Sequence, residues 1–408
     1  MHQPTPTLGS ILSVACLIAG TSIGGGMLAL PIVTGLAGFY PALFILLLCW
    51  TLMTLSGLAL LEVSLWMDEN DHYISMSEKL LGTWGKVVSW VLYLFIGYAS
   101  LVAYTAGGGE QFGLTVEFLT GQPLSKLVNC ACFLGIFGAA IAISAKIVGK
   151  LNSILFVGMV ASYCGLVLIG LPQVHPTYLG HVDWSYLPLT VPLLLTSFSY
   201  QAVVPSLRPL LKNHGPSLRW ALLLGTTITL VIYLIWLVLI LGIIPLEGEY
   251  GLRHAFQNDQ LATLYLEKYV GDSFVAPMAK FFSFFALVTS FLGIGMGLFD
   301  FLSDGLKIPK NRWGTVKLLS LMGFPILYCA VYLERAFFSA LDSSGGYGDT
   351  ILSGFIPLSM LWVGLYHRGW RIQGGVFPWN RPIILLLIGC FLSGLLLEIA
   401  MHTGLVTV

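Results

Sequence analysis

Four of the seven residues 20–26 are glycines, and they lie inside a long apolar stretch near the amino terminus. Glycine is a poor former of helix interiors, so we expect unwound backbone there. Lipid cannot satisfy such backbone, which is tolerated only when it is buried in protein or lines a wet cavity. Freed N–H groups at residues 24–26 could hold a carboxylate at the positive end of a helix dipole, while carbonyls near Thr21 and Ser22 could hold an ammonium. The free backbone groups of this run could therefore form a binding surface, because charged groups need partners once they leave water.

A second polar run, residues 196–201, lies among prolines. Pro188 and Pro192 precede it and Pro205 follows it. Proline removes a backbone donor and disturbs the preceding helical turn, so we expect a second break whose carbonyls join the ammonium site and whose side chains face that of the ligand. The residues expected to contact the ligand are Thr21, Ser22, Gly24, Gly25, Gly26, Tyr104, Phe198, Ser199, Tyr200 and Gln201.

Glycines at such spacing also occur where helices pack or where hydrolases carry their nucleophile. Gly20 and Gly24 fit the small-xxx-small pattern of packed membrane helices, as do Gly293 and Gly297, and packing is the preferred interpretation of the second pair. Residues 20–24 match the G-x-S-x-G of hydrolases, but that motif needs a strand-to-helix turn and a histidine partner. All eight histidines fall in loops or near the termini. We therefore expect no enzyme, no cofactor and no metal site other than one for a transported sodium ion.

The elements that position these runs follow from composition. Only 9% of the 408 residues are charged, 57% are hydrophobic, and the formal net charge is zero. Soluble domains carry about a quarter charged residues, and nucleic-acid binding needs a basic surface. The chain is thus predicted to be an all-α integral membrane protein without a nucleic-acid partner.

A spanning helix needs about 20 mostly apolar residues and excludes ionised groups from its centre. The first uncharged interval, residues 1–61, is long enough for two helices, and its middle carries a Gly/Pro turn signal. Nine further intervals bring the prediction to 11 spans, at 87–109, 127–145, 151–182, 184–207, 220–246, 281–299, 318–333, 350–367 and 382–397. An amino terminus in the cytoplasm places 14 Lys and Arg residues inside and 5 outside, as the positive-inside rule requires. The carboxyl terminus is then outside.

Two connections are predicted to have structure of their own. Residues 67–85 read as a short amphipathic segment on the cytoplasmic side. Residues 245–277 form the longest outside loop, and their apolar spacing indicates a helix on the outer face. That helix is either an extracellular lid or an ordinary surface helix.

The two expected breaks fall in spans 1 and 6, the first members of two five-span halves. Interrupted helices at matching positions of two halves are typical of secondary transporters with inverted repeats. We therefore expect one transmembrane domain, residues 1–408, with repeats at about 8–172 and 187–367 and an extra helix at about 381–404.

The sequence resembles the aromatic amino acid permeases, the tyrosine- and tryptophan-specific transporters of the amino acid, polyamine and organocation superfamily, and the tyrosine branch looks most similar. The matching motifs are Leu8-Gly9-Ser10 with Ile18 through Pro31, Leu60-Leu-Glu-Val63, Gly107-Gly-Gly-Glu110, Thr196 through Tyr200 with Val204-Pro-Ser206, and Ser290 through Gly293 with Gly297 through Asp300 and Asp304. The resemblance implies eleven helices in a five-plus-five inverted repeat and cotransport of an aromatic amino acid with a cation, usually a proton. The sequence departs from the commoner pattern at Gly25 and at Tyr200-Gln201, which bear on the substrate. For such a substrate, ring stacking would give affinity and Gln201 could read a hydroxyl or an indole N–H.

A candidate cation site lies in span 8, where Ala286, Thr289 and Ser290 share one helix face. Sodium-coupled members of the fold that the resemblance implies use this spacing opposite carbonyls of span 1, here those of Ala19 and Ser22. The alternative is that the two hydroxyls bond back to their own helix.

Intramembrane carboxylates are the candidate proton carriers. Glu110 and Asp300 are the foremost, although Asp300 could instead pair with Lys146 or another basic group in a gate. Glu62 and Glu398 are read as structural or interfacial.

The resulting expectation is an importer of an aromatic amino acid, tyrosine foremost, in the cytoplasmic (inner) membrane, with no obligate protein partner. The competing functions are an uncoupled exchanger of the same fold and a channel or sensor. The sequence leaves open the coupling ion and its stoichiometry, the choice among tyrosine, tryptophan and phenylalanine, the oligomeric state and the resting conformation.

Overall fold

The computed structural model describes residues 6–68, 71–143, 145–270, 275–371 and 377–405, without the side chains of 145–150, 267 and 275–276. Over these ranges the chain is helical and contains no strand. Ten helices are long and apolar enough to cross a membrane, and a bent pair of shorter helices gives up to 11 spans. The predicted all-α membrane fold is thereby confirmed.

The bent pair is the first span. Helix α1 (Leu8–Ser22) ends and α2 (Gly25–Ala37) begins within the glycine run, and the two are bent by 59°. The predicted break at this run is confirmed, because helical structure stops at Ile23 and Gly24.

The second interruption lies in the sixth span. Helix α7 (Leu187–Ser197) ends just before Phe198, and the chain resumes through the short 3-10 turn η4 (Gln201–Val203) and α8 (Val204–Leu207). Another 3-10 turn, η5 (Pro209–Leu211), leads out. The polar run among prolines therefore forms the second predicted break.

The tenth span was predicted too short. Its helix starts at α14 (Ala336–Ser343), continues as the π-helix η6 (Ser344–Phe355) and α15 (Ile356–Trp362), and ends with η7 (Val363–His367). The predicted start at residue 350 was wrong, because charged residues were taken to end spans, whereas Asp342 and Asp349 lie inside this one.

The amphipathic segment and the third span form one helix, α4 (Tyr73–Thr120), which bends at Gly82 where φ is +75°. This positive φ suits glycine, which has no Cβ to clash. Lys79 forms ion pairs with Asp68 and Asp71 before the bend. The predicted segment at 67–85 thus contains the first arm of α4, which runs from Tyr73 to the bend at Gly82.

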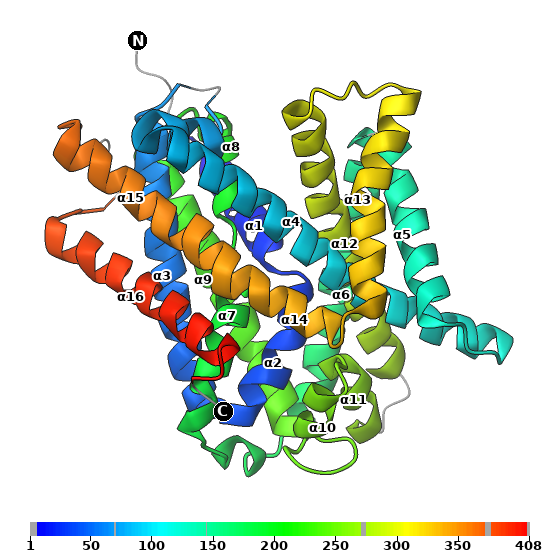
Figure 1. The fold of residues 1–408 in the computed structure, drawn as a ribbon. Helices are drawn as coiled ribbons and strands as arrows, with labels where there is room; N and C mark the ends of the chain where they lie inside the picture. The colour runs from blue at the N-terminus through cyan, green and yellow to red at the C-terminus, as the bar shows by residue number, and fades with distance from the viewer. Residues whose placement is uncertain (1–5, 69–70, 144, 271–274, 372–376, 406–408) are drawn as a thin grey trace.

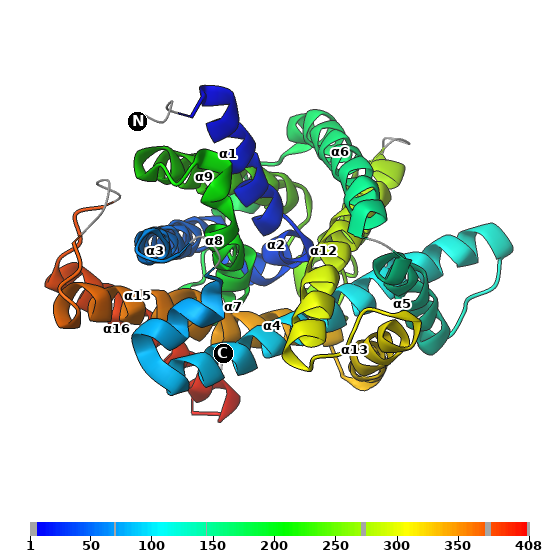
Figure 2. The ribbon, with the colours of Figure 1, turned by 90° about the horizontal axis from the view of Figure 1, so that it is seen from above.

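The remaining spans are α3 (Phe39–Leu65), α5 (Lys126–Ile143), α6 (Ala145–Gly170), α9 (Gly215–Ile243), α12 (Val275–Gly305), α13 (Arg312–Tyr332) and α16 (Arg381–His402). Seen from above in Figure 2, α2, α7 and α8 lie in the middle of the bundle, and α1 runs from its edge to the first break there. Helices α3 and α9 flank them on one side, and α6 and α12 flank them on the other. The broken segments are therefore enclosed by protein.

Two short helices, α10 (Leu252–Gln257) and α11 (Ala262–Tyr269), lie in the long loop after α9, next to the lower end of α2 in Figure 1. Both pack against α2, and Leu252 lies where a side chain at Gly35 would extend. The loop thus covers one end of the broken first span, which agrees with both alternatives for this loop.

Candidate functional site

A cavity of about 830 Å³ lies at the two helix breaks. Its walls come from α1, α4, α6, α12, the polar run after α7 and the tenth span. Most of the predicted ligand residues line it, namely Thr21, Ser22, Gly24, Gly26, Tyr104, Ser199, Tyr200 and Gln201. Chain segments distant in the sequence therefore meet around one space.

The glycines of the first break allow close approach of three neighbours. A Cβ at Gly24 would collide with the hydroxyl of Ser290, one at Gly25 with the ring of Tyr104, and one at Gly26 with the hydroxyl of Ser197. The N–H groups that begin α2 have no partner within the helix. Gly24 and Gly26 line the cavity, whereas Gly25 supports Tyr104 instead.

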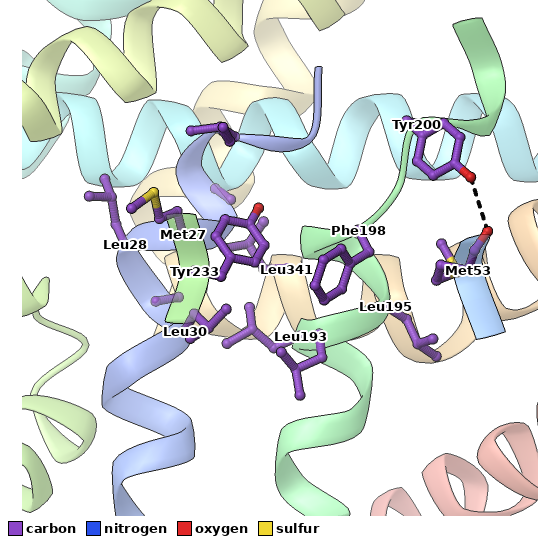
Figure 3. Close-up of a cluster of buried hydrophobic side chains, with 14 of the residues drawn as sticks. Met27, Leu28, Leu30, Met53, Leu193, Leu195, Phe198, Tyr200, Tyr233 and Leu341 are labelled. Atoms are coloured by element: carbon purple, nitrogen blue, oxygen red, sulfur yellow. Dashed lines mark hydrogen bonds between the residues drawn. The ribbon is translucent and has the colours of Figure 1, made fainter. Parts of the chain in front are cut away.

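Phe198 does not line the cavity. Its ring is buried and packs against Tyr233 of α9 with ring centroids 5.2 Å apart. Figure 3 shows it among buried side chains of α7 and α9, including Leu193 and Leu195. Its side chain therefore packs on the side of the second break that faces away from the cavity.

Tyr200 and Gln201 line the cavity, yet their polar groups are used within the protein. The Tyr200 hydroxyl and the Gln201 amide nitrogen each donate a hydrogen bond of 3.2 Å to the carbonyl of Met53. Figure 3 shows the hydrogen bond from Tyr200. The Gln201 side-chain oxygen accepts from the N–H of Tyr200 at 2.9 Å. These bonds fix the second break against α3.

Two aromatic residues of α9 hold the breaks and were missed by the sequence reasoning. The Tyr233 hydroxyl lies 2.7 Å from the carbonyl oxygen of Ser22 and 2.8 Å from that of Ser197. Trp236 donates from Nε1 to the carbonyl of Met27 at 3.0 Å. Both side chains are fully buried. A signal was available, because these are polar-tipped aromatics about one turn apart in the uncharged interval 220–246.

The candidate cation residues are only partly gathered. Ser22, Thr289 and Ser290 line the cavity, whereas Ala19 and Ala286 are buried and do not. The Thr289 hydroxyl lies 2.8 Å from the Phe285 carbonyl and 3.1 Å from that of Ala286, within its own helix. For Thr289 this is the back-bonding alternative that the sequence left open, and its hydroxyl oxygen can still accept; the Ser290 side chain interacts with Tyr104 instead.

Neither candidate proton carrier lies in this cavity. Glu110 lines a separate cavity of about 770 Å³ with Lys126, Asp259 and Arg335. Asp300 is half exposed and forms an ion pair with Lys310 at 2.8 Å. That bond fits the pairing alternative with another basic group; the side chain of Lys146 lies outside the described residues.

Asp349 is an acid that lines the cavity, and the sequence reasoning missed it. It lies in η6, is 1% exposed, and accepts hydrogen bonds from the hydroxyls of Ser199 at 2.5 Å and Ser353 at 2.9 Å. The available signal was the run Ser343-Ser-Gly-Gly-Tyr-Gly-Asp349, in which an acid ends a small-residue segment directly before a predicted span.

The cavity is open toward one end of the molecule. Thr21, Ala202 and Ser206 line it and are exposed. Figure 1 shows α1 and α8 above α2, at the end of the molecule away from α10. Every residue of α2, beyond the first break, is buried. Access therefore runs past α1 and α8, and the α2 and α10 end is closed.

A buried site built from two helix breaks is the arrangement expected of a transporter. A model of the tryptophan/tyrosine permease family matches residues 7–396 of the chain. The chain belongs to this family. The resemblance drawn from the sequence motifs is thereby confirmed, and the protein is a multi-pass membrane permease.

Individual relatives agree with this assignment. The permease is 29% identical over 393 residues to "tyrosine-specific transport system 1" of Haemophilus influenzae, covering 94% of each chain. It is 30% identical over 343 residues to a "tryptophan-specific transport protein" of Pseudomonas aeruginosa, covering 82% of each chain. A "tyrosine permease" of Enterobacter agglomerans is 28% identical over 371 residues, covering 86% of each chain. These relatives are transport proteins, which confirms the expectation of a transporter and not an enzyme.

Proposed function

We propose that this permease imports an aromatic amino acid, tyrosine foremost, across the cytoplasmic membrane by symport with a cation through alternating access. The proton is the first candidate ion, and sodium is the second. The observation that carries the proposal is the cavity in which both helix breaks expose polar backbone and side-chain groups beside aromatic rings. The relatives named for tyrosine and for tryptophan support the substrate class.

The substrate's charged ends are assigned to the breaks. Its carboxylate would accept from the N–H groups that begin α2 near Gly24 and Gly26, where the helix dipole is positive. Its ammonium would donate to carbonyl oxygens near Thr21, Ser22 and Phe198, where the preceding helices end. These interactions replace water for both charges.

The substrate's ring is assigned to the aromatic wall of the cavity. Tyr93, Tyr104 and Phe156 line it from α4 and α6. Aromatic pairs contribute about 0.5–1.5 kcal/mol beyond the area that they bury. Such a wall favours tyrosine, tryptophan or phenylalanine over an aliphatic amino acid.

The direction of access follows from the predicted orientation. With the amino terminus in the cytoplasm, as the Lys and Arg distribution indicates, the open end past α1 and α8 faces the cytoplasm. The lid helices α10 and α11 then lie outside.

Uptake into proteoliposomes tests the proposal. Labelled tyrosine should accumulate against its gradient when a proton or a sodium gradient is imposed, and it should compete with tryptophan and phenylalanine but not with leucine. Accumulation that survives collapse of both gradients would reject symport and leave an exchanger or facilitator. A lack of competition by every aromatic amino acid would reject the substrate class.

A further inference from the structure

The carboxyl group of Asp349 is unusual among the polar groups of the cavity. Its Oδ1 accepts from Ser199 and Ser353, and the Thr196 hydroxyl, which donates to the Leu341 carbonyl, also interacts with the carboxyl group. The Oδ2 atom is buried and makes no hydrogen bond of ordinary geometry among the described residues. Buried polar atoms are nearly always paired. An unpaired carboxyl oxygen beside a cavity is therefore suited to bind a proton or another small ligand reversibly.

Asp349 is also linked directly to the ligand site. Ser199, which donates to its Oδ1, belongs to the break of the sixth span. Any movement of that break alters a hydrogen bond to the carboxyl group, and any change of charge on the carboxyl group acts on the break.

The cavity walls offer this carboxyl group no counter-charge within the described part of the chain. Among the described residues that line the cavity, Asp349 is the sole Asp or Glu, and none is Lys, Arg or His. An ionised carboxylate in such surroundings is costly unless it is paired.

The titratable groups on the elements packed around Asp349 are few. Tyr73 and Tyr104 of α4 are the phenols that interact electrostatically with Asp349, while α7 and α15 carry no titratable side chain. Glu398 of α16 lies behind Gly346 and contacts His402 at 3.3 Å. Glu62 of α3 and Asp342 of α14 do not line the cavity. Asp349 thus faces hydroxyl groups and the cavity.

We propose that Asp349 is the group that carries the coupled proton, in place of Glu110 or Asp300. The inference rests on the proposed symport. When the site faces the outside, water there delivers a proton to a carboxylate oxygen, which gives a neutral carboxylic acid. After the site opens to the cytoplasm, as in this structure, the acid returns that proton to water in the cavity as the carboxylate reforms. Because the proton is only carried, no other reactant is consumed.

The decisive variant is Asp349→Asn, which keeps the shape and remains neutral at every pH. In proteoliposomes, exchange of external labelled tyrosine for internal tyrosine should stay near the wild-type rate, since exchange needs no net proton movement. Accumulation driven by a proton gradient should fall to the equilibrium level. The pH dependence of tyrosine binding, measured by scintillation proximity, should disappear.

Glu398→Gln is the matched control, because it neutralises another buried carboxyl group that lies outside the cavity. It should keep proton-driven accumulation. Ser353→Ala removes one donor to the Asp349 carboxylate and should shift the pH midpoint of uptake upward by about one unit, since a hydrogen bond to a charged group contributes about 1.5 kcal/mol.

The outcomes separate the two proposals. If wild-type accumulation ignores a proton gradient, proton coupling itself fails. If wild-type accumulation requires the gradient and Asp349→Asn keeps it, the assignment of Asp349 is overturned. Loss of both exchange and binding in a folded Asp349→Asn protein would also overturn it, because the carboxyl group would then bind the substrate. Folding is checked by monodispersity in detergent.

Discussion

The hydroxyl of Tyr233 lies 2.7 Å from the carbonyl oxygen of Ser22, the last residue of α1. The same hydroxyl lies 2.8 Å from the carbonyl of Ser197, the last residue of α7. One hydroxyl group of the continuous helix α9 thus contacts the terminal carbonyls of both α1 and α7. Its single proton is shared between two carbonyls that lipid could not satisfy.

Tyr233→Phe removes only the hydroxyl and keeps the ring, yet it should impair transport because both carbonyls lose their donor. Leaving buried carbonyls without a donor costs about 1–3 kcal/mol, so we expect a clear drop in melting temperature together with weaker tyrosine binding. Tyr163→Phe is the matched control, because its hydroxyl donates to the Ile232 carbonyl at 2.9 Å, away from the breaks. Equal binding losses in both variants would contradict a specific role for Tyr233.

Gly25→Leu should abolish tyrosine binding. A side chain at Gly25 would enter the ring of Tyr104, which lines the cavity, so either that ring or the start of α2 must move. Gly135→Leu in α5 has open space around it and should bind as the wild type does. Binding to purified protein by scintillation proximity distinguishes the two, and wild-type affinity of Gly25→Leu would count against the site at the first break.

The double variant Thr289→Ala and Ser290→Ala tests the sodium alternative. If sodium drives uptake, loss of two hydroxyl ligands should raise the sodium concentration for half-maximal uptake at least tenfold, which corresponds to about 1.4 kcal/mol. Proton-driven uptake should survive, because neither hydroxyl carries an acidic proton. An unchanged sodium response would reject this helix face as the cation site.

The open end of the cavity can be mapped by thiol labelling. In a variant whose seven cysteines are replaced, Thr21→Cys should react with a membrane-impermeant maleimide added from the cytoplasmic side. Thr34→Cys should not, because Thr34 lies in α2 and is 0% exposed. Preferential labelling of Thr21→Cys from the outside would reverse the proposed orientation.

Acidification should affect stability through Asp259, which lies in the turn between α10 and α11 and accepts from the N–H groups of Phe337 and Phe338. Burial raises the pKa of Asp259 above its ordinary value of 3.8. The folded protein therefore favours the protonated form of Asp259. The contribution of Asp259 to the free energy of unfolding is full below pH 3.8, and it is lost as the pH rises through the higher pKa of the folded state. Relative to Asp259→Asn, the wild-type melting temperature should fall over that window.

Asp183 should have the opposite effect on the pH dependence of stability, as measured against Asp183→Asn. Hydrogen bonds from the side chain and the N–H of Ser185 hold the pKa of exposed Asp183 below its ordinary value. Its contribution is present at neutral pH and is lost on acidification through the lowered pKa. Parallel pH curves for both variants would contradict these assignments.

The sequence predicted the fold through local signals. Glycine density placed a break within residues 20–26, prolines placed one within residues 196–201, and scarce charges counted the spans. These signals act within one helix turn, so no tertiary knowledge was required. The same logic failed for the tenth span, because a buried carboxyl group held by Ser199 and Ser353 was treated as the end of a helix.

The candidate site was predicted less completely than the fold. Backbone positions such as Gly24 and Gly26 were found because their role follows from local helix breaking. Side-chain roles depend on how helices face one another, which no local pattern specifies: Phe198 turns toward Tyr233, and Gln201 toward Met53. Asp349, Tyr233 and Trp236 were missed for the same reason, since their partners lie far away in the sequence.

The two aromatic anchors of α9 constrain how the permease can move. Tyr233 and Trp236 tie the end of α1, the start of α2 and the end of α7 to one continuous rod. These pieces must therefore move as a unit with α9 for as long as the three anchoring bonds persist. Opening of the closed end would therefore require α2 to separate from α10, which packs on it through Leu252. The strength of the contact between α10 and α2 would then limit the rate of the transport cycle.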